Sequence, residues 1–166
     1  MSFISSDEGV GSARRRRRLA VSVKQELREL RTQMALLNHQ VSSQIGLKDV
    51  DLDCLDLIGK HGPLSPSALA RRAGLHPATL TGILDRLQRA GWIIRERDPE
   101  ASDRRAIAVR ALPARNSELF RLYSGMNASM DEICAEYDER ELRLIADFLR
   151  RVTDAGADAT ADLTGE

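Results

Sequence analysis

Aromatic residues and long apolar runs are both scarce in this sequence of 166 residues. Aromatic residues make up 4% of the chain, so a core must be built mainly from Leu, Ile, Val, Ala and Met. No apolar run is longer than four residues, whereas a membrane-spanning helix needs about 20. The basic run Arg14–Arg18 is followed by only three apolar residues, and the core of a secretory signal peptide needs roughly 7–15. We therefore expect a cytoplasmic protein without a membrane partner.

Cysteine is also rare in this sequence, and the common catalytic motifs are absent. Cys54 and Cys134 are isolated and lack C-x-x-C spacing, so neither a disulfide framework nor a zinc site is expected. We interpret both as buried structural thiols. The sequence has no glycine-rich phosphate loop, no Ser/His/Asp order and no pair of carboxylates in an apolar setting. It therefore predicts a protein that is not an enzyme and that needs no cofactor or metal.

The formal net charge is zero, but the charges are unevenly distributed. Residues 1–59 carry nine basic and eight acidic side chains, and residues 60–112 carry ten and five. Residues 113–166 carry six basic and twelve acidic ones. A basic middle between neutral and acidic segments is typical of a nucleic-acid-binding face whose supporting helices carry other charges.

Long helices are predicted on both sides of this basic middle. Apolar residues recur there at alternating steps of three and four, the spacing of a helix that packs along another helix. One such seam is Val23, Leu27, Leu30, Met34, Leu37 and Val41; a second is Leu119, Tyr123, Met126, Met130, Ile133 and Tyr137; a third is Leu142, Ile145, Leu149 and Val152. Asp138, with Glu141 three residues later, predicts the start of the last helix.

Short elements with clear boundaries occupy the middle of the chain. Val50–Lys60 is predicted to be helical, and Ser65-Pro66 is an N-cap followed by proline at the first helical position. That helix ends at Gly74, and a second one runs over 77–90 after a three-residue connection, which predicts a helix-turn-helix. Residues 92–97 and 106–112 are predicted strands, because polar and apolar residues alternate in the second. The loop over 98–105 makes them a hairpin, or wing, with arginines at its tip.

At this point the sequence resembles the MarR (multiple antibiotic resistance regulator) family of winged helix-turn-helix transcription factors. The motifs are L-x-x-x-D-L-x-C-L-x-L-I at 47–58, L-A-R-R-A-G-L at 69–75, T-L-T-G-I-L-D-R-L-Q-R-A-G-W-I-I-R at 79–95 and D-R-R-A-I-A-V-R at 103–110. The resemblance covers roughly residues 20–152. It implies a homodimer that binds pseudo-palindromic double-stranded operator DNA, most often as a repressor. In many members a small phenolic or amphipathic ligand releases the DNA.

The predicted fold is therefore mainly α with a small β-hairpin wing, a winged helix-turn-helix flanked by long dimerisation helices. Its expected segments are a disordered basic tail over 1–18, a dimerisation helix over 19–46, the DNA-binding lobe over 47–112, C-terminal dimerisation helices over 113–152 and a frayed tail over 153–166. We expect an effector cleft between the Val50–Lys60 helix, the first long helix and the lobe, lined mainly by aliphatic side chains.

The residues expected to contact DNA lie on the second helix of the motif and on the wing. Thr79 and Thr81 offer hydroxyls to phosphates or bases, and Gly82 stands where the family often has an arginine. Arg86 either reaches a phosphate or pairs internally with Asp85 or a wing acid. The resemblance implies that the aspartate of the wing orients an arginine toward DNA. The complete set is Pro77, Ala78, Thr79, Thr81, Gly82, Arg86, Asp103, Arg104 and Arg105.

Each of these signals has a second interpretation. The threonines are also compatible with a solvated helix surface, and Asp103 with Arg105 is compatible with a structural ion pair in the hairpin. The run Arg14–Arg18 is either a solvated tail or a segment that lies along DNA beside the operator. For the whole protein the alternative is a winged-helix scaffold for protein–protein contacts without specific DNA binding.

Overall fold

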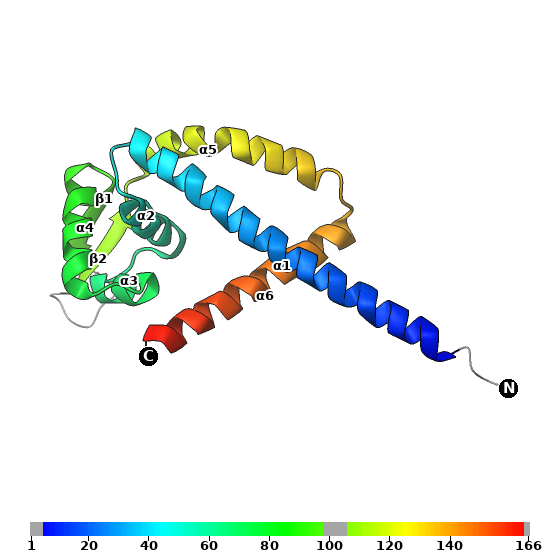
Figure 1. Cartoon of the computed structure of the whole chain (residues 1–166). Helices are drawn as coiled ribbons and strands as arrows, with labels where there is room; N and C mark the ends of the chain where they lie inside the picture. Colours follow the sequence, from blue (N-terminus) through cyan, green and yellow to red (C-terminus); the bar gives the residue numbers. More distant parts are fainter. Residues whose placement is uncertain (1–4, 98–105, 165–166) are drawn as a thin grey trace.

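The structure, a computed structural model, describes residues 5–97 and 106–164. The elements are α1 (Ser5–Gln44), α2 (Asp49–His61), α3 (Pro66–Ala73), α4 (Pro77–Arg89), β1 (Ile93–Arg97), β2 (Ile107–Ala111), α5 (Pro113–Cys134) and α6 (Glu139–Thr164). The fold is mainly helical with one antiparallel hairpin, as predicted. The short elements form a lobe at one end of the molecule. Helices α1 and α5 extend away from it, and α6 runs back from the far end of α5 (Figure 1).

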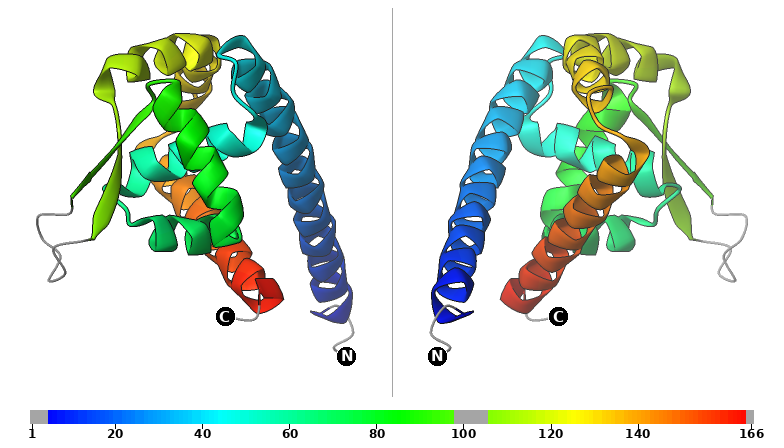
Figure 2. Two further views of the ribbon diagram at one scale, coloured as in Figure 1. Left: turned by 90° about the vertical axis from the view of Figure 1, so that its left-hand side faces the viewer. Right: turned by 90° about the vertical axis from the view of Figure 1, so that its right-hand side faces the viewer.

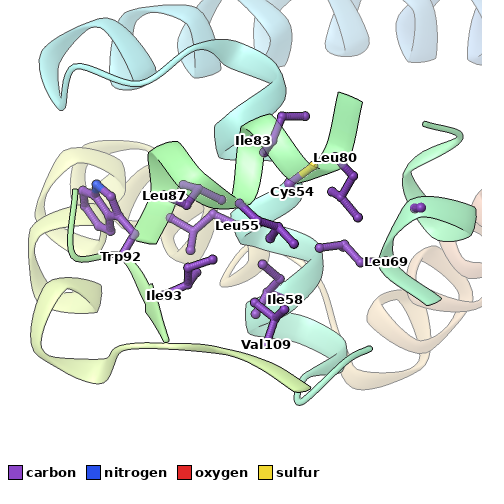
Figure 3. Close-up of a cluster of buried hydrophobic side chains, with 12 residues drawn as sticks. Cys54, Leu55, Ile58, Leu69, Leu80, Ile83, Leu87, Trp92, Ile93 and Val109 are labelled. Carbon is purple, nitrogen blue, oxygen red and sulfur yellow. The ribbon is translucent and has the colours of Figure 1, made fainter. Parts of the chain in front are cut away.

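The core of the lobe is aliphatic and includes one aromatic residue. The buried stripe of α4 packs against α2, α3 and the hairpin, and Trp92 closes one edge of the cluster (Figure 3). The fully or nearly fully buried members are Cys54, Leu55, Ile58, Leu69, Ala70, Leu80, Ile83, Leu84, Leu87, Trp92, Ile93 and Val109. The predicted stripe of α4 is thus the side that holds the helix on the lobe, and its other faces remain free.

Local signals in the sequence set the boundaries of the helices. The Ser65 hydroxyl accepts a hydrogen bond from the Ala68 N–H at 3.2 Å, which caps α3. Gly74 ends α3 in the left-handed conformation with φ 62°, where a side chain would be strained. The predicted capping box of α6 is confirmed, because Asp138 and Glu141 exchange two backbone-to-side-chain hydrogen bonds of 2.9 Å.

The hairpin is extended by a contact that the sequence did not indicate. Leu64, just before α3, pairs with Val109 of β2 through two backbone hydrogen bonds of 3.1 and 2.8 Å. The residues before the helix-turn-helix are thereby tied to the second strand of the wing. This bridge is one residue long and joins two residues that are 45 positions apart, so no local sequence pattern indicates it.

The structure differs from the prediction at both ends of the chain. Helix α1 begins at Ser5, so the helix includes most of the predicted disordered tail over 1–18 and the whole run Arg14–Arg18. Helix α6 continues to Thr164 through most of the predicted frayed tail over 153–166. The extension of α1 contains five arginines and that of α6 four alanines, and both residue types are strong helix formers. Each extension is therefore an extra few turns on a long helix.

The long helices leave much apolar surface uncovered within one chain. Helices α1 and α6 run separately for most of their length (Figure 2). Leu19, Val23 and Leu30 on α1 are 42–67% exposed, and the α6 seam residues Ile145, Leu149 and Val152 are 38–43% exposed. Within the described residues, no helix is long and apolar enough to cross a membrane. These exposed seams are apolar surface that the lobe does not cover.

Candidate nucleic-acid interface

Helix α4 presents a surface of small side chains on the side opposite its buried stripe. Pro77, Ala78, Thr79 and Thr81 are all exposed, and Gly82 is half-buried. The Thr81 hydroxyl donates to the Pro77 carbonyl oxygen at 3.0 Å, which leaves its oxygen able to accept a further hydrogen bond. A Cβ added at Gly82 would meet only the Arg86 guanidinium at 3.6 Å. Five of the nine predicted contact residues thus lie together on the accessible first turns of α4.

The N-terminus of α4 offers fewer free donors than a helix start usually does. Pro77 has no N–H, and the Ala78 N–H donates to Nδ1 of His76 at 3.2 Å. His76 is the N-cap residue. A phosphate oxygen at this position would therefore have to displace the imidazole before it could use the Ala78 N–H.

Arg86 forms an internal ion pair with a partner that the sequence did not suggest. Its guanidinium donates to both carboxylate oxygens of Asp51 on α2, at 3.0 Å from Nε and 2.5 Å from Nη2. Asp51 is 1% exposed. This hydrogen bonding raises the pKa of Arg86 further above its ordinary value. This ion pair holds α4 on α2, and a contact between the partly exposed Arg86 side chain and a phosphate stays a prediction.

A second ion pair neutralises the acidic residue on the outer side of α4. Asp85 is exposed, and its carboxylate lies 2.6 Å from the Arg95 guanidinium of β1. An unpaired carboxylate here would repel a phosphate backbone, so the pair makes this face compatible with DNA. On the hairpin, Arg110 pairs with Glu96 at 2.6 Å. The wing residues Asp103, Arg104 and Arg105 lie outside the described residues.

The structure adds basic residues that were not among the predicted contacts. Arg71 and Arg72 in the last turn of α3 and Arg89 in the last turn of α4 are exposed, and no ion pair joins them to another described residue. Arg71 also lines a hollow of about 460 Å³ between α3 and the start of α4, with His76 and Pro77. Exposed arginines in helical last turns are common, so their sequence pattern alone carries little information. Of the three, Arg71 lies beside the start of α4, whereas Arg72 lines a hollow against α2.

A second hollow lies between the lobe and α5. It has a volume of about 420 Å³ and is lined by Leu55, Asp56, Gly59, Ala111, Leu119, Phe120, Tyr123 and Asn127. Burial is the main cause that raises the pKa of both Asp56 and Tyr123. This hollow lies between α2, β2 and α5, whereas the effector cleft was predicted against α1, and the effector cleft itself stays a prediction. Two of the side chains that line the hollow are aromatic, whereas the prediction was an aliphatic lining.

One contact fixes the start of α5 to the lobe. The Arg115 guanidinium lies over the Trp92 ring, 3.9 Å from its centroid, a cation–π contact. The same guanidinium donates to the Ala90 carbonyl oxygen and to Glu118. The helix that forms one wall of the hollow is therefore attached directly to the residues that end α4 and begin β1.

The two cysteines differ in exposure, which corrects the prediction that both are buried. Cys54 is fully buried in the lobe core and Cys134 is exposed at the end of α5. Burial raises the pKa of the Cys54 thiol to about 11, so at pH 8 about one molecule in a thousand carries the reactive thiolate. With a disulfide reagent at pH 8 we expect one fast thiol in the native protein and a second one only after denaturation. The Cys134→Ser variant should lose the fast phase; a fast phase that persists would contradict this assignment.

The fold, together with the exposed side of α4, defines a winged helix-turn-helix protein, a class of DNA-binding proteins. A family model described as the MarR family matches residues 47–107. The HTH-type transcriptional regulator YcgE of Bacillus subtilis (strain 168) is 32% identical over 130 residues, which cover 78% of this chain and 83% of that protein. The chain therefore belongs to the MarR family of transcriptional regulators.

Two further proteins, one compared by sequence and one by structure, are similar to this chain. The HTH-type transcriptional repressor YetL of Bacillus subtilis (strain 168) is 28% identical over 94 residues, covering 54% of this chain and 55% of that protein. Among solved structures, a mutant of MepR from a multidrug resistant S. aureus clinical isolate superposes with a TM-score of 0.68 at 16% identity. That comparison covers 80% of this chain and 96% of that chain. At this low identity the structural match supports the fold.

Proposed function

We propose that this MarR family regulator binds a pseudo-palindromic operator as a homodimer in the cytoplasm and represses transcription from it. The observation that carries the proposal is the outer side of α4. It combines small exposed side chains, an acid neutralised by Arg95 and the exposed Arg71 beside the start of the helix. The start of a helix with such a surface fits a major groove about 12 Å wide. Repression is favoured because a curated relative, YetL, carries that role in its name.

The dimer in this proposal is supported by the exposed apolar seams of α1 and α6. Surfaces of this kind are rarely left open on a monomer. A two-fold axis would place the two α4 helices about 10 base pairs apart on one side of the duplex. The regulator's affinity for an operator would then depend on both half-sites.

Footprinting on the DNA upstream of the protein's own gene tests operator binding. We expect a protected segment with two related half-sites about one helical turn apart, and binding that weakens as salt rises. Binding of equal strength to any duplex, or no protection at all, would reject the operator and favour the alternative of a scaffold for protein–protein contacts.

Substitutions on α4 and on the wing should have different effects on DNA binding. Contacts to phosphates and to the minor groove set affinity with little base identity, whereas contacts to base edges set sequence preference. We expect Arg105→Ala to weaken binding to operator and scrambled duplexes alike and to flatten the salt dependence. Thr81→Ala should cost the operator roughly 1–3 kcal/mol more than the scrambled duplex. Affinities at two salt concentrations measure both. An unchanged salt slope for Arg105→Ala would remove the wing from the interface.

The hollow between α2 and α5 is the proposed effector site. Its size and mixed lining suit a small amphipathic or phenolic molecule, and α5 is one of the long helices that carry the exposed seams. A ligand that binds there more tightly in one orientation of the lobe shifts the spacing of the two α4 helices and so the affinity for DNA. A panel of phenolic and lipophilic compounds should include one that releases the operator, and Gly59→Phe should block that release. If no compound in a broad panel changes operator affinity, the effector proposal fails.

A further inference from the structure

The far ends of the two terminal long helices carry opposite charges. The basic end of α1 is the run Arg14–Arg18, and the acidic end of α6 consists of Asp154, Asp158 and Asp162. All eight side chains are exposed, and none forms an ion pair with another described residue. Residues 153–164 contain no basic side chain. Both ends are therefore available to an oppositely charged partner.

Each charged end is unfavourable for the helix that carries it. Asp154, Asp158 and Asp162 follow one another at steps of four, so each carboxylate is adjacent to the next on the helix surface and the charges repel. They also lie near the C-terminus of α6, where the helix dipole favours positive charge. Five adjacent arginines repel one another in α1 in the same way. A partner of opposite charge would reduce the repulsion between like charges in each helix.

The apolar seams lead directly to these two ends. On α1 the exposed Leu19 and Val23 follow the basic end. On α6 the seam continues after Val152 through Gly156, Ala159 and Leu163, again at steps of four and three. Charged residues beside an apolar seam are the arrangement by which packed helices select their partner and its orientation.

The arrangement of the helices keeps the two ends apart within one chain. Helices α1 and α6 cross in Figure 1, and the start of α1 and the end of α6 diverge to opposite sides. In the views of Figure 2 both ends lie at the same lower side of the molecule. A two-fold axis midway between these two ends would bring the basic end of one protomer toward the acidic end of its partner.

We propose that the dimer is closed by two charge contacts, in each of which Arg14–Arg18 of one protomer lies along Asp154, Asp158 and Asp162 of the other. The inference rests on the proposed homodimer and adds the part of the surface that selects a second copy of this chain. DNA phosphates would also attract the basic end. However, they would leave the acidic ends, on the same side of the molecule, unpaired and repelled, so the second copy is the partner that satisfies both.

Charge exchange tests this proposal. The first variant replaces Arg14, Arg15, Arg16, Arg17 and Arg18 by glutamate, the second replaces Asp154, Asp158 and Asp162 by arginine, and the third combines both. At low salt we expect each of the first two to raise the dimer dissociation constant about tenfold or more, since several exposed ion pairs act together. The third should return to within about threefold of the unmodified protein, because complementarity is restored. The first and second variants, mixed, should form a heterodimer in preference to either homodimer.

Sedimentation velocity over a concentration series and circular dichroism give the readouts. The defects of the first two variants should shrink in about 1 M salt, where charges are screened beyond roughly 3 Å. If the first variant dimerises normally, or the third does not recover, the contact is wrong. A first variant that dimerises normally but binds long duplexes more weakly would assign Arg14–Arg18 to DNA. If the unmodified protein is itself monomeric at micromolar concentration, it is the homodimer of the proposed function that fails.

Discussion

Leu27→Asp combined with Leu149→Asp is expected to convert the protein into a folded monomer that no longer holds its operator. Each substitution removes an apolar side chain from a seam and puts a charge in its place, and each occurs twice in a dimer. Burying one leucine contributes roughly 1.5–3 kcal/mol, so the dimer dissociation constant should rise by roughly three orders of magnitude or more. A monomer holds one half-site only, so its operator affinity should fall toward that for random DNA.

The chain offers a matched control for this experiment. Leu36 on α1 and Leu144 on α6 are 55% and 70% exposed, and both lie off the seams of their helices. Leu36→Asp with Leu144→Asp introduces the same charges on the same helices and should leave the dimer intact. Light scattering and thermal unfolding distinguish dissociation from loss of folding. If the control pair dissociates the dimer and the seam pair does not, the interface lies on the other face of these helices.

Arg86→Ala is expected to destabilise the lobe and not primarily to weaken a DNA contact. The substitution leaves the Asp51 carboxylate buried without its cation, and removing one partner of a buried pair is costly. Because the Arg86 side chain is 35% exposed, we place the loss at the lower end of such effects, about 2–3 kcal/mol in the free energy of unfolding. The double variant Asp51→Ala with Arg86→Ala should lose less than the two single losses combined.

Arg89→Ala provides the comparison on the same helix. Arg89 is exposed in the last turn of α4, so its truncation should change stability by less than about 0.5 kcal/mol. It should instead reduce DNA affinity and the salt slope if the arginines around α4 face the phosphates. Denaturant unfolding and duplex titrations separate the two effects. If the Arg86→Ala variant is stable and its DNA affinity depends less on salt, Arg86 contacts the DNA.

The short elements of the lobe could be predicted from the sequence because their boundaries are coded locally. Ser65 caps α3, Gly74 ends it, and the buried stripe of α4 repeats at helical spacing. The interactions across the lobe could not be predicted in this way. Asp51 and Arg86 are 35 positions apart, and the choice between that carboxylate and a phosphate depends on which surface is buried. The ends of α1 and α6 were missed because their composition suits both a solvated tail and an exposed helix.

Only part of the candidate site could be predicted, again because local sequence patterns indicate single elements but not contacts between distant ones. The exposed threonines on α4 follow from helical periodicity alone. Arg71 of α3 and Arg95 of β1, the partner of Asp85, come from separate elements, and only the folded lobe brings them next to α4. Residues 98–105, which include the wing tip, stay a prediction.

The short side chains on the outer side of α4 have a consequence for how a regulator of this kind would choose among genomic sites. Ala78, Thr81 and Gly82 lack the long forked donors that distinguish one base pair from another. On the proposed operator the helix backbone could come close to the groove floor there, but few bases would be read individually. Discrimination then falls on groove width and on the ease with which a duplex bends. The sites would vary in base sequence but share a narrow range of DNA shapes. Away from the bases that face Thr81, single base changes would be tolerated wherever they leave the local stiffness of the DNA unchanged.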